Sequence, residues 1–291
     1  MGKIEKPSWL KIKLQTNEKY SQIKQIVELN QLHTICSSGK CPNINDCWSR
    51  GTATFMIGGE ICTRSCKFCA TQSGKPMPLD AEEPARIAHS VKIMNLKHCV
   101  ITSVDRDDLV DKGAHHWAST IKAIRSENPS TIIEVLTPDF DARKDLLGIV
   151  FEAKPDIFSH NMETIQRLSN TIRSRAKYDV SLDVLRLASK AGFVTKTGIM
   201  VGLGETEEEV VTLMQGVRNV NVRLFTIGQY LQPTKANIPV TQYITPEQFS
   251  KYEQLGLALG FDNIASGPLV RSSYMAENNI VSASMRERNN S

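Results

Sequence analysis

The stretch Thr52-Ala-Thr-Phe-Met-Ile-Gly-Gly-Glu-Ile-Cys62-Thr-Arg-Ser-Cys66-Lys-Phe-Cys69 decides how the rest of the chain is interpreted. Its first part, residues 52–58, is β-branched and apolar, which predicts a buried strand. The cysteines that follow have spacings of three and then two residues, so three thiols lie on one tight loop. Functional groups of α/β folds gather on the loops that follow strands. We therefore expect this strand to lead directly into a thiol-based site.

The alternation of strand and helix signals continues along the chain. Further apolar runs that predict strands are Cys99–Ser103, Ile132–Leu136, Ile157–Ser159, Thr195–Val201 and Leu224–Leu231. Segments with helical periodicity lie between them, at Ala85–Met94, Trp117–Ser126, Asp141–Ala153, Ser181–Gly192 and Glu205–Val217. Such alternation indicates a parallel sheet with right-handed crossovers. Six strand–helix units predict an α/β fold, a partial (βα)6 barrel with its function at the C-terminal ends of the strands.

Three regions are expected along the chain. Residues 1–51 form an N-terminal extension that carries a second group of cysteines, and residues 52–265 form the partial barrel. Residues 266–291 form a C-terminal tail that contains Arg271-Ser272-Ser273-Tyr274.

The composition is that of an ordinary globular protein, with 41% hydrophobic and 23% charged residues. A formal charge of +4 over 291 residues is small, so it gives no indication of nucleic-acid binding. No apolar run approaches the roughly 18 residues of a membrane span, and the start of the chain lacks the apolar core of a secretory signal. These features favour a cytoplasmic protein. In that reducing compartment, clustered cysteines more often bind metal than pair as disulfides.

A second group of cysteines, Cys36, Cys41 and Cys47, precedes the first predicted strand. A cube of four irons and four sulfides needs one ligand on each iron, so three thiolates leave one iron for something else. Two triplets therefore indicate two four-iron clusters. Zinc is the weaker alternative, because structural zinc takes four ligands and usually paired two-residue spacings. The seventh cysteine, Cys99, lies in an apolar run and is expected to be a buried small hydrophobe.

The spacing of Cys62, Cys66 and Cys69 directly after a first strand resembles that of radical S-adenosylmethionine enzymes. This resemblance implies that the open iron binds the amino and carboxylate groups of S-adenosylmethionine. It also implies that one electron from the cluster would cleave the sulfonium bond, giving methionine and a 5′-deoxyadenosyl radical. Phe68, beside the last cysteine, is expected to shield the cluster from water.

The chain is also similar to the lipoyl synthase family, over about residues 7 to 276. Besides the four-then-five spacing of the first cysteine triplet, the matching segments are Pro42–Trp48, Gly51–Met56, Val104–Leu109, His160–Thr164, Lys196–Glu205, Gly228–Thr234 and Gly267–Tyr274. This similarity implies insertion of two sulfurs at C6 and C8 of an octanoyl chain on a lysine of a carrier protein.

In that family the first triplet holds an auxiliary four-iron cluster, whose fourth ligand is a serine of the Arg-Ser-Ser-Tyr motif. Ser273 is the expected ligand and Ser272 the alternative, because the sequence does not separate adjacent hydroxyls. A serine oxygen is a harder donor than a thiolate and suits ferrous iron less well. It would therefore leave readily from a cluster that is consumed as the sulfur source.

The resemblance also implies partners. The substrates would be octanoylated carriers, namely the glycine cleavage H protein and the acyltransferase subunits of 2-oxoacid dehydrogenases. An electron donor such as ferredoxin or flavodoxin would reduce the radical cluster, and an iron–sulfur carrier would rebuild the auxiliary one. Neither nucleic acid nor a membrane is expected as a partner.

Several loop residues are candidates for binding S-adenosylmethionine. Ser103 ends the second predicted strand and Asp105 follows it. The superfamily binds the amino end of the cofactor at this position, and an ammonium needs acceptors. An ordinary ion-pair loop is the alternative for Asp105. Glycines let backbone approach a ligand closely, and helix N-termini favour anions. The remaining candidates, on later loops, are Asn161, Glu163, Arg173, Gly202 and Glu205.

Two other functions would explain part of this pattern. A methylthiotransferase would share the three-then-two spacing, but it would lack the upstream triplet and normally add an RNA-binding domain, for which the chain has no room. A zinc-binding module that is not an enzyme would explain clustered cysteines but not the matching barrel loops.

Overall fold

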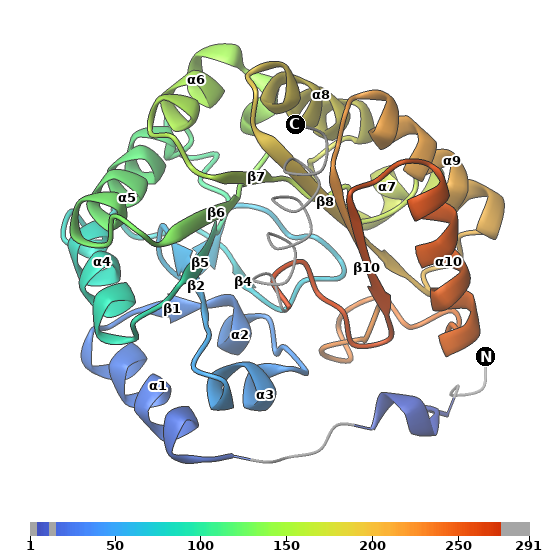
Figure 1. Cartoon of the computed structure of the whole chain (residues 1–291), viewed down its shortest axis with the longest axis horizontal. Helices are drawn as coiled ribbons and strands as arrows, with labels where there is room; N and C mark the ends of the chain where they lie inside the picture. The colour runs from blue at the N-terminus through green and yellow to red at the C-terminus, as the bar shows by residue number, and fades with distance from the viewer. Residues whose placement is uncertain (1–4, 12–15, 275–291) are drawn as a thin grey trace, which may run out of the picture. The chain divides into compact units, whose positions relative to one another are not determined.

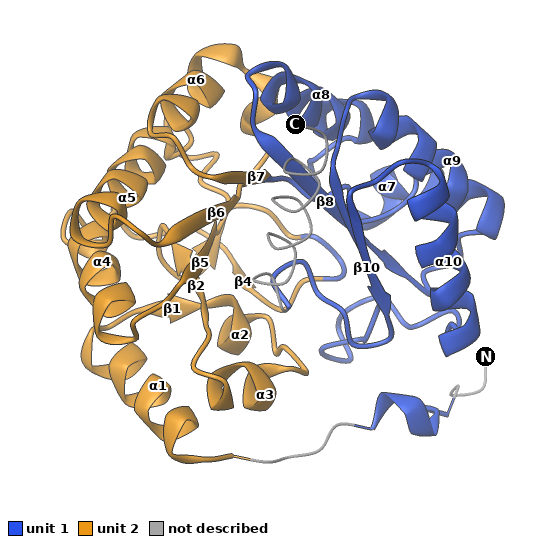
Figure 2. Ribbon diagram, viewed as in Figure 1, with its two compact units in different colours: residues 1–12, 66–68, 159–291 blue, residues 13–65, 69–158 orange. Residues whose placement is uncertain are grey.

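The computed structural model describes residues 5–11 and 16–274, and these residues fall into two compact units (Figure 2). Unit 1 comprises Met1–Ile12, Cys66–Phe68 and Ser159–Ser291, and unit 2 comprises Lys13–Ser65 and Cys69–Phe158. The short segment Cys66–Phe68 of the cysteine loop thus belongs to unit 1, although its neighbours belong to unit 2.

Unit 2 begins with a small helical region that carries the first cysteine triplet. The side chain of Asn17 accepts a hydrogen bond from the backbone of Tyr20 and begins the first helix. The rings of Tyr20 and Trp48 lie 5.4 Å apart and join that helix to the third one. The elements of this region are α1 (Glu18–Leu29), β1 (His33–Thr34), α2 (Ile35–Ser38) and α3 (Ile44–Ser49).

The sheet of unit 2 has the strand order β1-β2-β5-β6-β7. Strand β1 is antiparallel to β2, whereas β2, β5 and β6 are parallel neighbours. The strands after β1 are β2 (Thr54–Ile57), β5 (His98–Ser103), β6 (Ile132–Leu136) and β7 (Ile157–Ser159). Helices α4 (Glu83–Ile93), α5 (Ala114–Glu127) and α6 (Lys144–Glu152) cover the outer face of this sheet (Figure 1).

The register of unit 2 brings its functional loops together. Ile57 at the end of β2 pairs with Ser103 at the end of β5, so the loops that follow these two strands start side by side. The first of them contains a second, two-stranded parallel sheet, formed by β3 (Ile61–Cys62) and β4 (Gln72–Ser73).

Unit 1 repeats the strand–helix alternation. Strands β8, β9 and β10 are neighbours in that order, and β9 is parallel to both β8 and β10. Their outer face packs against the helices in one apolar core that includes Val201, Leu213, Phe225 and Phe261. The elements are η1 (Ser8–Leu10), α7 (Gln166–Ile172), α8 (Tyr178–Lys190), β8 (Val194–Val201), α9 (Glu207–Asn219), β9 (Leu224–Gln229), α10 (Pro246–Ala258) and β10 (Asn263–Gly267).

The predicted α/β fold with parallel strands is confirmed. Every predicted strand is present with its ends within two residues, and β6 and β7 have the predicted bounds. The predicted helix Asp141–Ala153 is instead a 3-10 turn, η2 (Phe140–Ala142), followed after Arg143 by α6. Strand β10 adds a parallel strand that was not predicted. In the described part of the chain, no helix has the length and apolarity needed to cross a bilayer.

Candidate functional site

The cysteine loop of unit 2 holds the sulfur of Cys62 among backbone donors. The N–H groups of Arg64 and Asp105 point at this sulfur from 3.4 and 3.3 Å. The Cys69 thiol interacts electrostatically with Cys62. Burial and the negative charge of Asp105 raise the pKa of Cys62 to about 12. This thiol ionises at neutral pH only if a cation binds it, which is the chemistry expected of an iron ligand.

A buried arginine ties this loop to its neighbours. Arg64 forms bidentate pairs with Asp107 at 2.7 and 3.0 Å and with Asp139 at 2.7 and 2.8 Å, and it lies 3.3 Å from Asp105. Burial opposes ionisation of Asp107, but hydrogen bonds from Arg64 and Lys112 outweigh it, and the pKa of Asp107 is lowered. For Asp105 burial dominates and raises its pKa to about 6.

The first triplet forms a separate group of thiols within unit 2. Cys36 lies in α2 and is buried, and Cys47 lies in α3, where Arg50 reaches its sulfur at 3.8 Å. Burial and the neighbouring thiols raise the pKa of Cys36 to about 11 and that of Cys47 to about 12. Cys41 therefore lies close enough to Cys36 and Cys47 to raise the pKa of both thiols, and the group needs positive charge nearby to ionise.

Both triplets fit the donor set of a four-iron cluster. Among the described residues, no three His, Cys, Asp or Glu side chains are arranged to hold a single metal ion. The cysteines of a cube bind different irons, so a cluster does not require that arrangement.

In unit 1, two backbone hydrogen bonds hold the segment Cys66–Phe68 in place. The N–H of Lys67 donates to the carbonyl of Ile172 at 2.9 Å, and the carbonyl of Lys67 accepts from Ile238 at 3.1 Å. Phe68 packs against the apolar group Ile172, Leu203 and Tyr230. Apolar packing thus fixes the position of the Phe68 ring, next to the last cysteine of the triplet.

Asn161 and Glu163 follow strand β7 and contact each other. The amide of Asn161 donates to Glu163 at 3.1 Å and lies within hydrogen-bond distance of the Ser272 hydroxyl. Glu163 has a φ of +65°, which is uncommon for a residue other than glycine. Its backbone is held there by bonds to Gly198 and Met200 of β8. Burial raises the pKa of the Glu163 carboxyl, and Arg173 opposes that rise. Backbone held in this way is typical of functional sites.

Arg173 is buried at the end of α7. Its Nη1 donates to the Ser181 hydroxyl at 2.7 Å, and the same hydroxyl lies 2.9 Å from Nε2 of His160. A guanidinium has five N–H donors, so this contact does not exhaust the hydrogen-bonding capacity of Arg173.

The predicted glycine loop after β8 is organised around the Glu205 carboxylate. It accepts hydrogen bonds from the N–H of Gly202 at 2.5 Å and of Leu203 at 2.9 Å. Gly202 has a φ of +97°, and a Cβ there would lie 2.1 Å from Nε2 of Gln229. Glu205 therefore shapes the loop from within.

The Arg271–Tyr274 motif belongs to unit 1. A Cβ at Gly228 would lie 2.0 Å from the carbonyl oxygen of Val270, so only glycine lets this segment cross β9. Within residues 5–11 and 16–274, the Ser273 hydroxyl has no hydrogen-bond partner, whereas Ser272 is bonded to Asn161.

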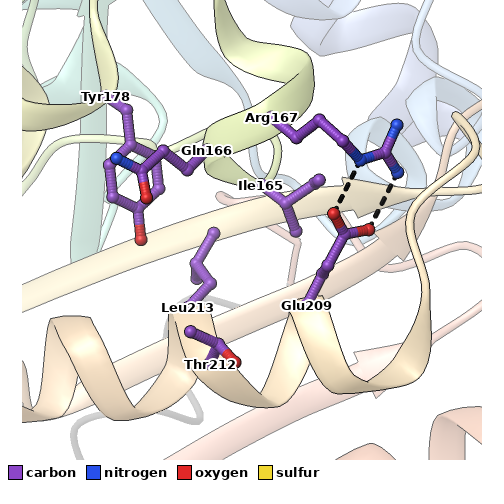
Figure 3. A pocket seen from close by; sticks show the side chains of 7 residues that line it. All are labelled: Ile165, Gln166, Arg167, Tyr178, Glu209, Thr212 and Leu213. Atoms are coloured by element: carbon purple, nitrogen blue, oxygen red, sulfur yellow. Dashed lines mark hydrogen bonds and ion pairs between the residues drawn. The ribbon is translucent and has the colours of Figure 1, made fainter.

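A cavity of about 320 Å³ lies elsewhere in unit 1, between α7, α8 and α9 (Figure 3). Its two charged residues, Arg167 and Glu209, bind each other at 2.7 and 2.9 Å. None of the predicted site residues lines it. The residues that line it are Ile165, Gln166, Arg167, Tyr178, Glu209, Thr212 and Leu213.

Comparison with known proteins decides between the functions considered from the sequence. The radical SAM superfamily, where SAM is S-adenosylmethionine, matches residues 56–216. A lipoyl synthase of Parabacteroides distasonis is 61% identical over 277 residues, which cover 95% of this chain and 99% of that protein. The chain belongs to the lipoyl synthase family. Another member, from Flavobacterium johnsoniae, is 54% identical and covers 95% of this chain and 96% of that protein.

Solved structures show the same fold at low sequence identity. HydG, a hydrogenase maturase, aligns with a TM-score of 0.60 and 14% identity, over 79% of this chain and 54% of its own. Methylornithine synthase aligns with a TM-score of 0.55 and 14% identity, over 75% and 72%. The predicted radical enzyme of the lipoyl synthase family, with its four-iron chemistry and S-adenosylmethionine, is confirmed.

Sequence analysis missed the residues that hold these loops in place. Arg64 stands inside the cysteine motif, where an uncharged residue would satisfy the spacing equally well, so a charge between two of the cysteines was the available signal. Its partner Asp139 is distant in sequence, so nothing in the local pattern pointed to it.

Proposed function

We propose that this chain inserts two sulfur atoms at C6 and C8 of a protein-bound octanoyl-lysine, forming lipoyl-lysine. The observation that carries the proposal is the presence of two separate thiol triplets in a member of the lipoyl synthase family. One triplet suits the generation of a radical, and the other suits the supply of sulfur.

The radical centre is proposed to be bound by Cys62, Cys66 and Cys69. A four-iron cluster held by these thiols would be the source of the electron that cleaves the sulfonium bond of S-adenosylmethionine. Phe68, packed in its apolar group, would exclude water from that side of the loop. Ser103 and Asp105 would accept hydrogen bonds from the ammonium of the cofactor.

The rest of S-adenosylmethionine is assigned to residues of unit 1. Arg173 would bind the carboxylate through donors that Ser181 does not use. The backbone of the Gly202 loop, shaped by Glu205, would pack against the adenosine. Asn161 and Glu163 would contact the cofactor or the substrate beside it.

The sulfur source is proposed to be held by Cys36, Cys41 and Cys47, with Ser273 as the fourth ligand. This makes two four-iron clusters in each chain. Ser273 is favoured over Ser272 because the Ser272 hydroxyl is already engaged with Asn161. A serine ligand would let this cluster come apart during turnover, since its oxygen suits ferrous iron less well than thiolate does.

The carriers would be the octanoylated glycine cleavage H protein and acyltransferase subunits of 2-oxoacid dehydrogenases. A small reductant of the ferredoxin or flavodoxin type would supply electrons, and an iron–sulfur carrier would restore the auxiliary cluster. The extension 1–51, barrel 52–265 and tail 266–291 remain our proposed division by role.

Anaerobic turnover with an octanoyl-lysine peptide tests the proposal. Cys36→Ala should still cleave S-adenosylmethionine but form no carbon–sulfur bond, whereas Cys62→Ala should do neither. Cys99→Ala is the matched control, because Cys99 is fully buried in β5 and belongs to neither triplet. It should keep about eight irons per chain, as two clusters require. Stoichiometric zinc in place of iron would refute the proposal.

A further inference from the structure

Arg64 occupies an unusual place, between two proposed ligands of the radical cluster. Its side chain is only 4% exposed and faces three carboxylates. Two of them, Asp105 and Asp107, follow strand β5, and the third, Asp139, follows strand β6. The Arg64 guanidinium therefore links the cysteine loop to the loops that follow strands β5 and β6.

The backbone around Arg64 is fastened as well. Its carbonyl accepts a hydrogen bond from the Ser73 hydroxyl at 2.8 Å. The Thr63 hydroxyl donates to the carbonyl of Asp105 at 2.9 Å and accepts from the N–H of Asp107 at 3.0 Å. These bonds hold the backbone at Thr63 and Arg64 in a fixed position relative to the backbone at Asp105 and Asp107.

The consequence appears at the Cys62 sulfur. Its two backbone donors are the N–H groups of Arg64 and Asp105, and these two residues are partners in the same ion pair. Hydrogen bonds to cluster sulfurs are one of the levers that set the reduction potential of an iron–sulfur cluster. They favour the reduced state, which carries the more negative charge. A nearby positive charge acts in the same direction.

We propose that Arg64 is a positioning residue that aims these two N–H groups at the Cys62 sulfur and so raises the reduction potential of the radical cluster. This inference rests on the proposed function, because it requires a cluster bound by Cys62, Cys66 and Cys69. Arg64 does not itself touch the reacting atoms. It acts through Asp105, Asp107 and Asp139.

Lysine and glutamine separate the roles of charge and geometry at this position. Lysine keeps the positive charge but lacks the planar fork that binds two carboxylates bidentately. Glutamine removes the charge and leaves three carboxylates without their shared counter-ion. Arg106→Gln is a matched control. Arg106 is also 4% exposed and pairs bidentately with a carboxylate of the same loop, Asp108 at 2.9 Å, but its partners do not include Cys62.

The test uses the full-length chain carrying Cys36→Ala, Cys41→Ala and Cys47→Ala, so that only the radical cluster contributes to the spectrum. Iron content and a redox titration followed by electron paramagnetic resonance are measured for this parent and for each added variant. The parent should bind about four irons and cleave S-adenosylmethionine. A parent that does neither would overturn the proposed function itself.

If the parent binds its cluster, adding Arg64→Gln should lower the ratio of reduced to oxidised cluster at a fixed potential at least tenfold. For a one-electron couple this corresponds to a fall in reduction potential of about 59 mV. Arg64→Lys should bind iron fully and lower this ratio about threefold or more, and Arg106→Gln should change it less than about twofold. If Arg64→Gln does not load iron, Arg64→Lys decides the matter. An unchanged potential in Arg64→Lys, or an equal shift in Arg106→Gln, would overturn the positioning role.

Discussion

The hydroxyl oxygen of Ser272 lies 2.8 Å from Nδ2 and 3.0 Å from Oδ1 of Asn161. This contact joins the C-terminal motif to the loop after β7, across 111 residues of sequence. It also separates two adjacent serines that look equivalent in the sequence. The Ser272 hydroxyl is engaged with Asn161, and this contact supports our proposal that Ser273 is the fourth ligand of the auxiliary cluster.

The first prediction concerns these two serines. Ser273→Ala should reduce formation of the dithiolane at least tenfold and shorten the lifetime of the auxiliary cluster, because one iron loses its proposed ligand. Cleavage of S-adenosylmethionine should continue. Ser272→Ala is the matched control and should retain most of the sulfur insertion. Anaerobic turnover and iron release to a chelator measure both effects. The opposite ranking of the two variants would assign the ligand to Ser272.

The second prediction tests how the C-terminal motif crosses strand β9. In Gly228→Ala the new methyl would lie 2.0 Å from the carbonyl oxygen of Val270, so backbone must move. Overpacking of this kind costs about 1 to 3 kcal/mol of unfolding free energy. In Gly148→Ala, within helix α6, the methyl meets no atom within 4 Å. That control should gain up to about 1 kcal/mol, because alanine favours a helix. Urea unfolding of the two variants would refute the crossing argument if both were equally stable.

Much of the fold could be predicted because its strands are short apolar runs between polar turns. Residues 132–136 and 157–159 had the bounds that the structure shows, since each run is mostly apolar and each holds a single polar residue, Glu134 and Ser159. Strand β10 was not predicted, because Asn263–Gly267 contains only one large apolar residue, Ile264. Its pairing with β9 supplies the rest of its stability.

The candidate site also has a part that the sequence predicts and a part that it does not. Cysteine spacing is local, so both triplets could be recognised from the sequence alone. The contacts that fix their surroundings are not local. Arg64 meets Asp139 across 75 residues, and Ser272 meets Asn161 across 111. No periodicity reveals such pairs, and only the folded chain shows which of two neighbouring hydroxyls is already engaged.

The third prediction concerns Glu205, whose carboxylate accepts from the backbone of Gly202 and Leu203. Glu205→Gln replaces one acceptor oxygen by an NH2 group that faces a donor, so one N–H loses its bond. We expect S-adenosylmethionine to bind about tenfold more weakly and the unfolding free energy to fall by about 1 to 3 kcal/mol. Glu208→Gln, on an exposed residue of helix α9, which follows this loop, is the control and should cost less than about 1 kcal/mol. Equal affinities for the cofactor in the two variants would show that the Glu205 contacts do not shape its site.

The fourth prediction follows from the raised pKa of Asp105, about 6, which burial causes against the opposing charge of Arg64. An unfolded aspartate has a pKa of about 4. Between pH 4 and 6 the folded, cluster-free chain therefore holds a proton that the unfolded chain has released. The free energy of unfolding should fall as pH rises through this window, by at most about 3 kcal/mol.

Asp105→Asn isolates this contribution, because an amide does not titrate and other carboxyl groups contribute equally to both proteins. Urea unfolding of the reduced, cluster-free protein at steps from pH 4 to 7 gives the two curves. Their difference should change across the window and become constant above about pH 7. A constant difference throughout would mean that the folded Asp105 releases its proton at the same pH as the unfolded one, and that burial does not control its charge.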